Sequence, residues 1–221
     1  MSKPRDEQTP APAADAAHRK AKMAASEPDT YRDRLRIALM GAAEQVIVTE
    51  GLAAVQARRL AQAANCSVGT LYNVFGDIDG LILAVNERTL GDLGRILNAA
   101  ATRSAAADTP TRLMALASAY LDFATANQLR WRAVFEHRLS DDKLAPASYR
   151  EDRRRLLALI EAQLVAAIPD APTRQDAAHA LFSAVHGIVV LSIDGKLAPF
   201  DPAQCERQIR FIVENVMRGL S

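Results

Sequence analysis

The sequence predicts an all-α protein with about nine helices. Alanine and leucine are abundant among its 221 residues, whereas glycine and proline number only 10 each. Apolar residues recur every three or four positions along several segments, which is the spacing that gives a helix one buried face. Two segments also open with a capping aspartate and a proline, at Asp108-Thr109-Pro110 and Asp201-Pro202, and such pairs signal helix starts.

Charge balance and cysteine content restrict the possible functions. Lys and Arg number 27 against 26 Asp and Glu, a net charge of +1, so a histone-like protein held on nucleic acid by bulk charge is not expected. Two cysteines, Cys66 and Cys205, are too few for a disulfide framework and suggest a reducing compartment. The densest apolar run, residues 188–193, is much shorter than the ~18 residues of a membrane span. We expect a cytoplasmic protein without a signal peptide.

Residues 1–28 are expected to form a disordered leader. They are rich in alanine, serine and charge, and four prolines interrupt any periodicity. Arg19, Lys20 and Lys22 form a small basic cluster within the leader. This cluster could reach DNA as an N-terminal arm, or it could simply be solvated.

Three helices are expected next, at about residues 30–50, 55–63 and 67–74. The first carries an apolar stripe at helical spacing, and Gly51 fits the position just past its end. The second and third are joined by a tight turn, in which Asn65 tolerates a left-handed backbone and Ser67 is a good N-cap. This pattern predicts a helix-turn-helix, whose second helix docks in the DNA major groove.

The same region resembles the DNA-binding domain of tetracycline-repressor-type (TetR family) regulators. The motifs that carry the resemblance are Glu50-Gly51-Leu52, Arg58-Arg59-Leu60-Ala61, Ser67-x-Gly69-Thr70-Leu71-Tyr72 and Phe75. The resemblance covers roughly residues 32–92. It implies an N-terminal helix-turn-helix domain and a C-terminal helical domain that binds a ligand and dimerises.

Three positions depart from the family pattern. Gln56 replaces a threonine that usually caps the helix before the turn. Val74 replaces a histidine or tyrosine that often touches the phosphate backbone, and Ile78 replaces a lysine that often opens the next helix. Each change removes a possible phosphate contact, so the departures concern DNA affinity more than the fold.

The rest of the chain is expected to form six helices, at about residues 77–101, 108–124, 129–138, 148–168, 173–196 and 201–220. The helix that starts near Asp77 is long enough to connect the head to the remainder. The run Arg153-Arg154-Arg155 is expected to point outward. The predicted domains are therefore a leader over residues 1–28, a DNA-binding domain over 29–76, and a ligand-binding and dimerisation domain over 77–221.

Few side chains of so short a recognition helix can reach DNA. Val68 and Thr70 offer methyl groups to thymine, Gly69 lets the backbone come close, and Asn73 can pair with adenine. The others are phosphate-positioning candidates, although Tyr72 could instead pack within the head. The residues expected to contact DNA are Gln56, Arg58, Ser67, Val68, Gly69, Thr70, Tyr72 and Asn73.

A single head buries little surface, so two heads are expected to act together, ~34–36 Å apart on a near-palindrome. The resemblance implies that the last two helices form an intersubunit four-helix bundle. An ordinary hairpin within one chain is the alternative. The residues expected at the dimer interface are Val185, Ile188, Val189, Ile209, Ile212, Val213 and Val216.

Two C-terminal segments, residues 131–138 and 182–188, loosely resemble a TetR subfamily with a Trp…His-Gly signature, with Phe182 in the tryptophan position. They suggest an apolar pocket with a few polar groups. Its candidate residues, each of which could instead be plain core, are Met114, Tyr120, Phe123, Trp131, Phe135 and His186. Metal binding by His179 with His186, or a redox switch at Cys66, is a minor alternative.

No phosphate-binding glycine loop, zinc cysteine pairs or nucleophile elbow is present, so we expect neither an enzyme nor a cofactor or metal. The expected function is a homodimeric, ligand-responsive transcriptional regulator, a repressor rather than an activator, with a DNA operator and a small-molecule effector as partners. The alternative is a helical protein–protein adaptor that has lost DNA binding. A regulator should lose operator affinity steeply as salt rises, whereas an adaptor should show no such dependence.

Overall fold

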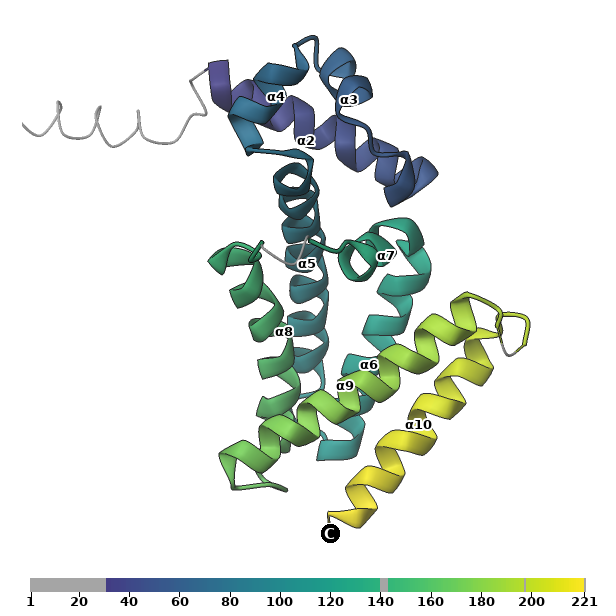
Figure 1. The fold of residues 1–221 in the computed structure, drawn as a ribbon. Coiled ribbons are helices and arrows are strands. Elements are labelled where there is room, and N and C mark those ends of the chain that lie inside the picture. Colours follow the sequence, from purple (N-terminus) through teal and green to yellow (C-terminus); the bar gives the residue numbers. More distant parts are fainter. Residues whose placement is uncertain (1–30, 140–142, 197, 221) are drawn as a thin grey trace, which may run out of the picture.

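The computed structural model describes residues 31–139, 143–196 and 198–220. Within these ranges the chain forms nine α-helices and one 3-10 turn, and it contains no β-strand. The predicted all-α class is thereby confirmed. The helices are arranged as a small head above a longer body (Figure 1). The leader and its basic cluster lie outside the described residues.

The head consists of α2 (Tyr31–Glu50), the 3-10 turn η2 (Leu52–Ala54), α3 (Ala57–Ala63) and α4 (Val68–Phe75). The sequence did not predict the 3-10 turn. The helices surround a compact apolar core, to which α5 and α7 also contribute. The buried members of this head core are Leu35, Leu39, Ala43, Val46, Ile47, Leu60, Leu71, Leu81, Val85 and Ala133.

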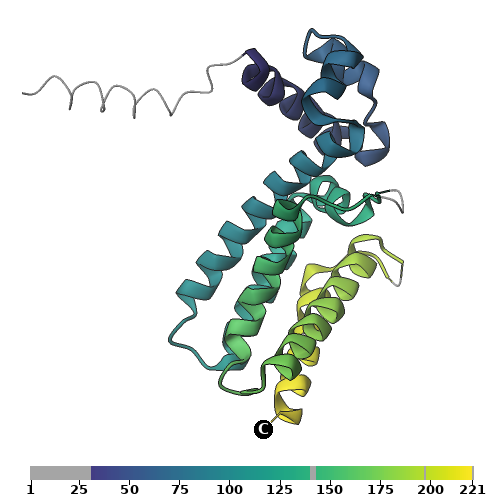
Figure 2. The same ribbon diagram turned by 60° about the vertical axis from the view of Figure 1, so that its left-hand side comes forward.

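The body contains α5 (Ile78–Arg103), α6 (Thr109–Ala126), α7 (Gln128–Glu136), α8 (Ala147–Leu164), α9 (Ala171–Ile193) and α10 (Pro202–Gly219). The long α5 descends from the head, α8 runs alongside it, and α9 and α10 form an antiparallel pair (Figure 2). The side chains of Asp108 and Asp201 each accept a backbone N–H at the start of their helix, as the sequence predicted. Helix α8 ends at Leu164, one turn before the predicted residue 168.

Helix α7 joins the head to the body. Its Ala133 is completely buried in the head core, and its backbone oxygen accepts a hydrogen bond of 3.0 Å from the side-chain amide of Asn86 in α5. Next to it, Arg130 lies 2.7 Å from a carboxylate oxygen of Asp92 in α5 and 3.5 Å from one of Glu44 in α2. Because both contacts are largely shielded from solvent, they hold the three helices together at the junction.

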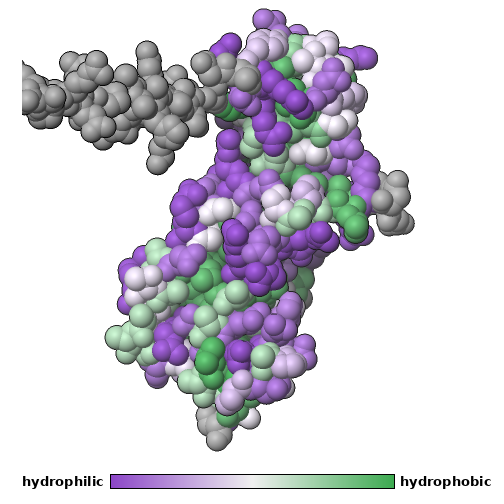
Figure 3. All heavy atoms as spheres, turned by 90° about the vertical axis from the view of Figure 1, so that its left-hand side faces the viewer, coloured by the Kyte–Doolittle hydropathy of each residue, from purple (hydrophilic) through white to green (hydrophobic). Residues whose placement is uncertain are grey.

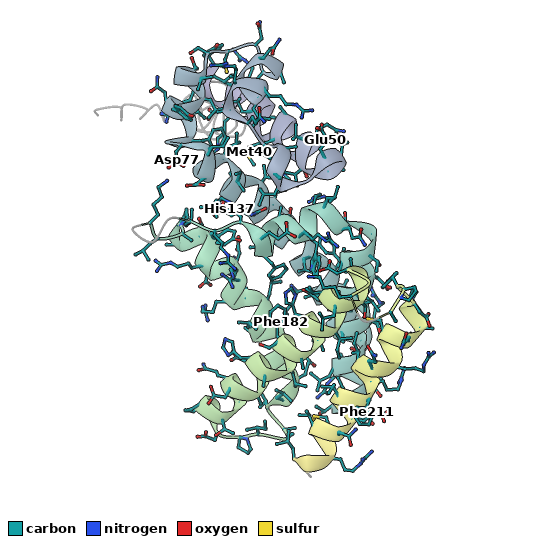
Figure 4. All side chains as sticks on the ribbon, turned by 45° about the vertical axis from the view of Figure 1, so that its right-hand side comes forward. Met40, Glu50, Asp77, His137, Phe182 and Phe211 are labelled. Atoms are coloured by element: carbon teal, nitrogen blue, oxygen red, sulfur yellow. The ribbon has the colours of Figure 1, made fainter. Side chains whose placement is uncertain are left out.

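A second set of contacts joins the loop before α8 to the first turn of α5. Lys143 Nζ lies 2.7 Å from Asp77 Oδ2 and 2.8 Å from Asp79 Oδ2. His137, which follows α7, places Nε2 3.5 Å from Asp79 Oδ1 just below the head (Figure 4). The hydrogen bond from Lys143 holds the pKa of Asp77 below its usual range, whereas burial lowers the pKa of His137.

Helix α9 is long and apolar but only partly buried. By length and composition it could cross a membrane, because an 18-residue window within it has a mean hydropathy of 1.5. Only 22% of that window is buried inside the chain, which is a low fraction for so apolar a helix. A core helix of a single folded chain would be mostly buried, whereas the described residues leave much of α9 exposed.

Candidate DNA-binding surface and ligand cavity

The turn between α3 and α4 has the geometry that the sequence predicts for a helix-turn-helix. Asn65 adopts a left-handed backbone with φ of 51°. The N–H of Cys66 then bonds to the carbonyl of Ala61 at 2.8 Å, which closes the turn. Leu60 of α3 and Leu71 of α4 are completely buried against each other and the head core. Two buried leucines therefore fix how α4 crosses α3, and the opposite face of α4 stays open.

The first turn of α4 is held by its own side chains. Ser67 Oγ accepts a hydrogen bond of 3.0 Å from the Thr70 N–H, as expected of an N-cap, and lies 2.8 Å from Thr70 Oγ1. Ser67 is exposed and Thr70 is half-buried. The two hydroxyls therefore form one polar pair at the open end of the helix. If one of them bonded to an external group, the other would have to reorient.

The exposed face of α4 carries little bulk near its start and more near its end. A Cβ added at Gly69 would meet only Ser67 Oγ, at an ordinary contact distance of 3.7 Å, so packing within the chain does not require a glycine there. Tyr72 is 42% exposed and Asn73 is also exposed. The position of Tyr72 favours an external contact over packing within the head. A duplex backbone could approach closely at Gly69 with these two side chains beside it.

Arg58 and Arg59, adjacent in α3, have different surroundings. Arg59 forms a bidentate ion pair with Glu50 at the end of α2. Arg58 is exposed and makes no hydrogen bond or ion pair with any other described residue. It borders a shallow hollow between α3 and α4 that also includes Ser67 and Val68. Arg58 is therefore free to contact a phosphate, whereas Arg59 is already partnered.

Two arginines that the sequence analysis did not single out also lie against α4. Arg32 Nη2 donates a hydrogen bond of 3.2 Å to the Asn73 carbonyl, and the Arg36 guanidinium lies 4.6 Å from the centre of the Phe75 ring. Both arginines lie in α2, more than 35 residues before the α4 residues that they contact. They place positive charge at the carbonyl end of the recognition helix, where it is favourable. Their position off the apolar stripe of the first helix gave no signal of this long-range contact.

Two of the three departures from the family motifs have local explanations. Gln56 occupies the N-cap position of α3, but its side chain makes no capping hydrogen bond and is exposed. Val74 and Ile78 are half-buried and pack against the head core. These two side chains therefore contribute to packing where other family members carry a polar group.

The body contains a cavity of about 100 Å³ between α5, α6, α8 and α9. Its walls are almost entirely apolar, and only Tyr120 and Arg153 bring polar atoms to them. The apolar lining residues are Leu90, Leu93, Leu97, Leu113, Leu116, Ala117, Val134, Phe135, Leu156, Leu157, Leu159, Ile160, Leu181, Phe182, Val185 and Val213. Figure 3 shows apolar side chains reaching the surface of the body among mostly hydrophilic ones.

One wall of the cavity is backed by an aromatic cluster. The Trp131 indole N–H donates a hydrogen bond of 2.9 Å to the Tyr120 oxygen, and the Tyr120 hydroxyl lies 2.7 Å from His186 Nδ1. Because the indole can only donate, the Tyr120 oxygen accepts from Trp131, whereas the direction of its bond to His186 is set by the imidazole tautomer. Burial lowers the pKa of His186 and raises that of Tyr120. Phe135 and Phe182 pack against the imidazole, with ring centres 4.3 and 5.5 Å away.

Arg153 differs from the two arginines that follow it. Arg154 and Arg155 both pair with Glu151 at 2.9 and 3.1 Å. Arg153 lines the cavity and has no hydrogen bond or ion pair to another described residue. All three arginines are exposed, as the sequence predicted, and Arg153 in addition lines the cavity. Its exposed head is at the cavity mouth, while its stem can lie along the apolar wall.

The chain matches two family descriptions. Residues 39–85 match the family described as bacterial regulatory proteins, tetR family, and residues 113–216 match the tetracyclin repressor-like C-terminal domain. The chain is also 32% identical over 176 residues to the HTH-type transcriptional regulator BetI of Burkholderia thailandensis, covering 77% of this chain and 87% of that protein. The chain belongs to the TetR family of transcriptional regulators. The resemblance seen in the sequence is confirmed.

Solved structures show the same fold. A TetR family regulator, PfmR of Thermus thermophilus, superposes with a TM-score of 0.56 at 19% identity, over 83% of this chain and 98% of that one. A transcriptional regulator from a Rhodococcus species gives a TM-score of 0.62 at 22% identity, over 86% of this chain and 97% of that one. These TetR-type folds share the arrangement of head and body described above.

Not all residues expected at the TetR ligand site line the cavity. Tyr120 and Phe135 do. Trp131 and His186 lie behind that wall in the aromatic cluster, and His186 is engaged with Tyr120. Their involvement with a ligand therefore stays a prediction. The two remaining candidates, Met114 and Phe123, are buried in the body core and do not belong to the cavity wall.

The expected dimer residues divide into two groups. Four of them are buried inside the single chain, which corrects the expectation that they face a partner; they are Val185, Val189, Ile209 and Val213. Two of these, Val185 and Val213, line the cavity instead. The other three, Ile188, Ile212 and Val216, are half-buried at the edges of α9 and α10. Apolar periodicity located the helices correctly but did not say which of two apolar sides faces the chain's own core.

Proposed function

We propose that this TetR-family chain is a homodimeric repressor that acts in the cytoplasm, binds an inverted-repeat operator, and is released when a small molecule occupies the body cavity. The observation that carries the proposal is the coexistence of two unpartnered surfaces. One is the exposed face of α4, and the other is the outer face of α9. A DNA duplex fits the first surface, and a second copy of the chain fits the second.

The outer face of α9 supports self-association. Ala180, Ala184, Gly187 and Leu191 follow one another at spacings of four, three and four, so they form one stripe along the helix. A Cβ at Gly187 would meet nothing within 4 Å, so the stripe is open on that side. On α10 the ring of Phe211 is 66% exposed on the outside of the body (Figure 4). Small residues beside one large apolar side chain suit close packing of helices against a second copy.

The DNA-binding role rests on the α3–α4 head. A free Arg58, the Ser67–Thr70 hydroxyl pair and the exposed Tyr72 and Asn73 lie on connected surface at the turn and along α4. These groups supply a phosphate contact, polar base contacts and an aromatic hydroxyl. The residues proposed to contact DNA are Gln56, Arg58, Ser67, Val68, Gly69, Thr70, Tyr72 and Asn73.

Release by a ligand follows from linkage. A molecule that binds better to a dimer with different head spacing lowers the affinity for an operator with fixed spacing. A coupling free energy of ~1–3 kcal/mol changes operator affinity by ~5–150-fold. Helix α5 lines the cavity at Leu90, Leu93 and Leu97, and it begins directly after the head. It is therefore the connection through which an occupied cavity would alter head spacing.

The proposal is tested by selecting bound sequences from a random DNA pool with the purified full-length protein. We expect one enriched inverted repeat, bound by a dimer, with affinity that falls steeply as salt rises. Half-sites should be centred about one helical turn, ~34–36 Å, apart or at a multiple of it. A strictly monomeric protein that prefers no duplex over random competitor would refute the proposal and favour the protein–protein adaptor.

A further inference from the structure

We infer that the body cavity takes an aliphatic monocarboxylate, an anionic amphiphile whose carboxylate pairs with Arg153 and whose hydrocarbon chain lies among the leucines of α5 and α8. This inference rests on the proposed ligand-responsive function and specifies the chemistry of its ligand. Three features of the cavity lead to it, namely its length, its single free charge and the engagement of its other polar groups.

The cavity is elongated along two helices that run side by side. Leu90 and Leu97 of α5 mark its extent on one wall, and Arg153 and Ile160 of α8 mark it on the other. Seven residues of α-helix rise ~10 Å, so both walls give the same length. The volume agrees with this length. A group the size of a water molecule needs ~10–15 Å³, so a cavity of about 100 Å³ accommodates a row of roughly seven to ten such groups.

Arg153 supplies the free positive charge. The positions three and four residues away on α8 hold Tyr149, Arg150, Leu156 and Leu157, so no carboxylate on its own helix can neutralise it. By contrast, Glu151 lies three residues before Arg154 and four before Arg155, and pairs with both. The only cation on the cavity wall is thus the member of the arginine run that forms no ion pair with a carboxylate among the described residues, although it acts electrostatically on Tyr149.

The other polar group on the wall is already engaged. The Tyr120 hydroxyl accepts from Trp131 and is also hydrogen-bonded to His186 Nδ1, so two protein side chains already engage it. The aromatic rings are also unsuited to a cation. A quaternary ammonium needs open ring faces, whereas Phe182 is stacked on His186 with ring planes 19° apart, and Phe135 lies 4.3 Å from the same imidazole. No Asp or Glu lines the cavity.

The orientation follows from these positions. Arg153 is at the end of the cavity nearer the head, level with the upper part of α5, because Leu156 one turn later lies against Gly94. The carboxylate therefore binds near the start of α8, and the chain points away from the head toward Leu97 and Ile160. An extended chain of about eight carbons spans nearly the same ~10 Å, since each carbon–carbon bond is ~1.5 Å and the chain zigzags.

The test compares the affinities with which three amphiphiles of equal chain length bind to the full-length protein. Decanoate, decan-1-ol and decyltrimethylammonium are titrated at concentrations below aggregation, and binding is followed by calorimetry and by the emission of Trp131, the single tryptophan. We expect decanoate to bind about tenfold more tightly than decanol. This ratio corresponds to the low end of the free energy of a hydrogen bond to a charged group, because Arg153 is exposed and solvent screens its charge. The ammonium should bind more weakly than decanol.

Matched variants locate the charge. Arg153→Gln should abolish the preference for decanoate over decanol, and Arg153→Glu should reverse it in favour of the ammonium. Arg154→Gln, in the adjacent residue that pairs with Glu151, should keep the wild-type preference. Both positions are exposed, so we expect these variants to fold as the wild type does. Equal affinity of the wild type for decanoate and decanol, or an unchanged preference in Arg153→Gln, would overturn the inference.

The same protein preparations separate this inference from the proposed function. Operator affinity is measured with the selected DNA in the presence and absence of decanoate. Operator binding by a dimer that shows no Arg153-dependent preference for decanoate would refute the ligand class and leave the repressor proposal intact. Arg153-dependent binding of decanoate by a protein that prefers no duplex would support the ligand class and refute the repressor proposal.

Discussion

The indole N–H of Trp131 donates to the hydroxyl of Tyr120 at 2.9 Å, and both side chains are almost completely buried. Since the same hydroxyl is also bonded to His186 Nδ1, Tyr120 links side chains from two other helices. Tyr120→Phe leaves the indole N–H and the imidazole Nδ1 unpaired. We expect the free energy of unfolding to fall by ~2–3 kcal/mol, measured by urea denaturation.

Tyr149→Phe is the matched control for this change. The Tyr149 side chain is equally buried, but its hydroxyl donates a longer hydrogen bond, of 3.3 Å, to the Val134 carbonyl and otherwise interacts only with the Asn86 side chain among the described side chains that can hydrogen-bond to it. Its loss should cost ~1 kcal/mol or less. Equal losses in the two variants would mean that the Trp131–Tyr120–His186 chain adds nothing beyond a single hydrogen bond.

His186 makes stability depend on pH. Burial lowers its pKa in the folded chain below the ordinary value of 6.5, so the unfolded chain takes up a proton at a higher pH than the folded chain does. The stability associated with neutral His186 is therefore fully present above pH 6.5 and is lost as pH falls from there through the folded pKa.

Urea denaturation at pH 7.5 and at pH 5.5 measures this effect. We expect the free energy of unfolding to be lower at pH 5.5, with a smaller difference in His186→Gln, whose side-chain amide can still hydrogen-bond to Tyr120. Part of the difference should remain in the variant, because burial lowers the pKa of His137 as well. An identical pH difference in both proteins would show that His186 does not contribute.

Arg58 and Arg59 provide an adjacent pair of variants for DNA binding. Arg58→Gln should weaken operator binding and reduce the slope of log affinity against log salt by about 0.9 per head, the value for one lost phosphate contact. Arg59→Gln should leave the slope nearly unchanged, because Glu50 already neutralises Arg59. Fluorescence anisotropy across a salt series measures both slopes. A larger change in Arg59→Gln would reverse the assignment of the two side chains.

Ser67→Ala removes the N-cap of the recognition helix and frees the Thr70 hydroxyl. We expect a loss of ~1 kcal/mol in stability together with weaker operator binding. Asp108→Ala removes the corresponding cap of α6, far from the DNA face, and should lower the melting temperature without changing operator affinity. If both variants bind the operator as the wild type does, the Ser67 hydroxyl is only a structural cap.

Phe211→Asp tests the proposed dimer surface. A charge at this exposed position on α10 should dissociate the dimer at micromolar concentration, because a buried unpaired carboxylate is strongly unfavourable. Leu144→Asp is the control, since Leu144 is 85% exposed in the loop before α8. Sedimentation equilibrium reports the mass of each. A dimer that persists in Phe211→Asp would move the interface away from this part of α10.

The sequence predicted features that depend on neighbours in the chain. Asn65 in the turn, Ser67 as a cap and the aspartates before α6 and α10 lie as expected, because each satisfies backbone groups within a few residues. The helix-turn-helix motifs also sufficed to assign the family, since their residues are consecutive and their spacing is set by one local geometry.

Features that depend on distant contacts were not predictable. Arg153 was expected outward because it belongs to a charged run, and only the space left between α5 and α8 brings it to a cavity. Val185 and Val189 lie on an apolar helix with two similar sides, so their spacing could not say which side is buried. The position of Arg32 beside Asn73 likewise joins residues 41 apart in sequence.

The burial of Ala133 in the head core has a practical consequence for recombining regulators. Domain exchange at residue 76 would strip the transplanted head of Leu81, Val85 and Ala133 and leave Glu44 facing a foreign α7 without Arg130. A workable chimaera must carry the first two turns of α5 and the adjoining surface of α7 with the head. The head of this protein can thus be transplanted intact only together with a piece of the body.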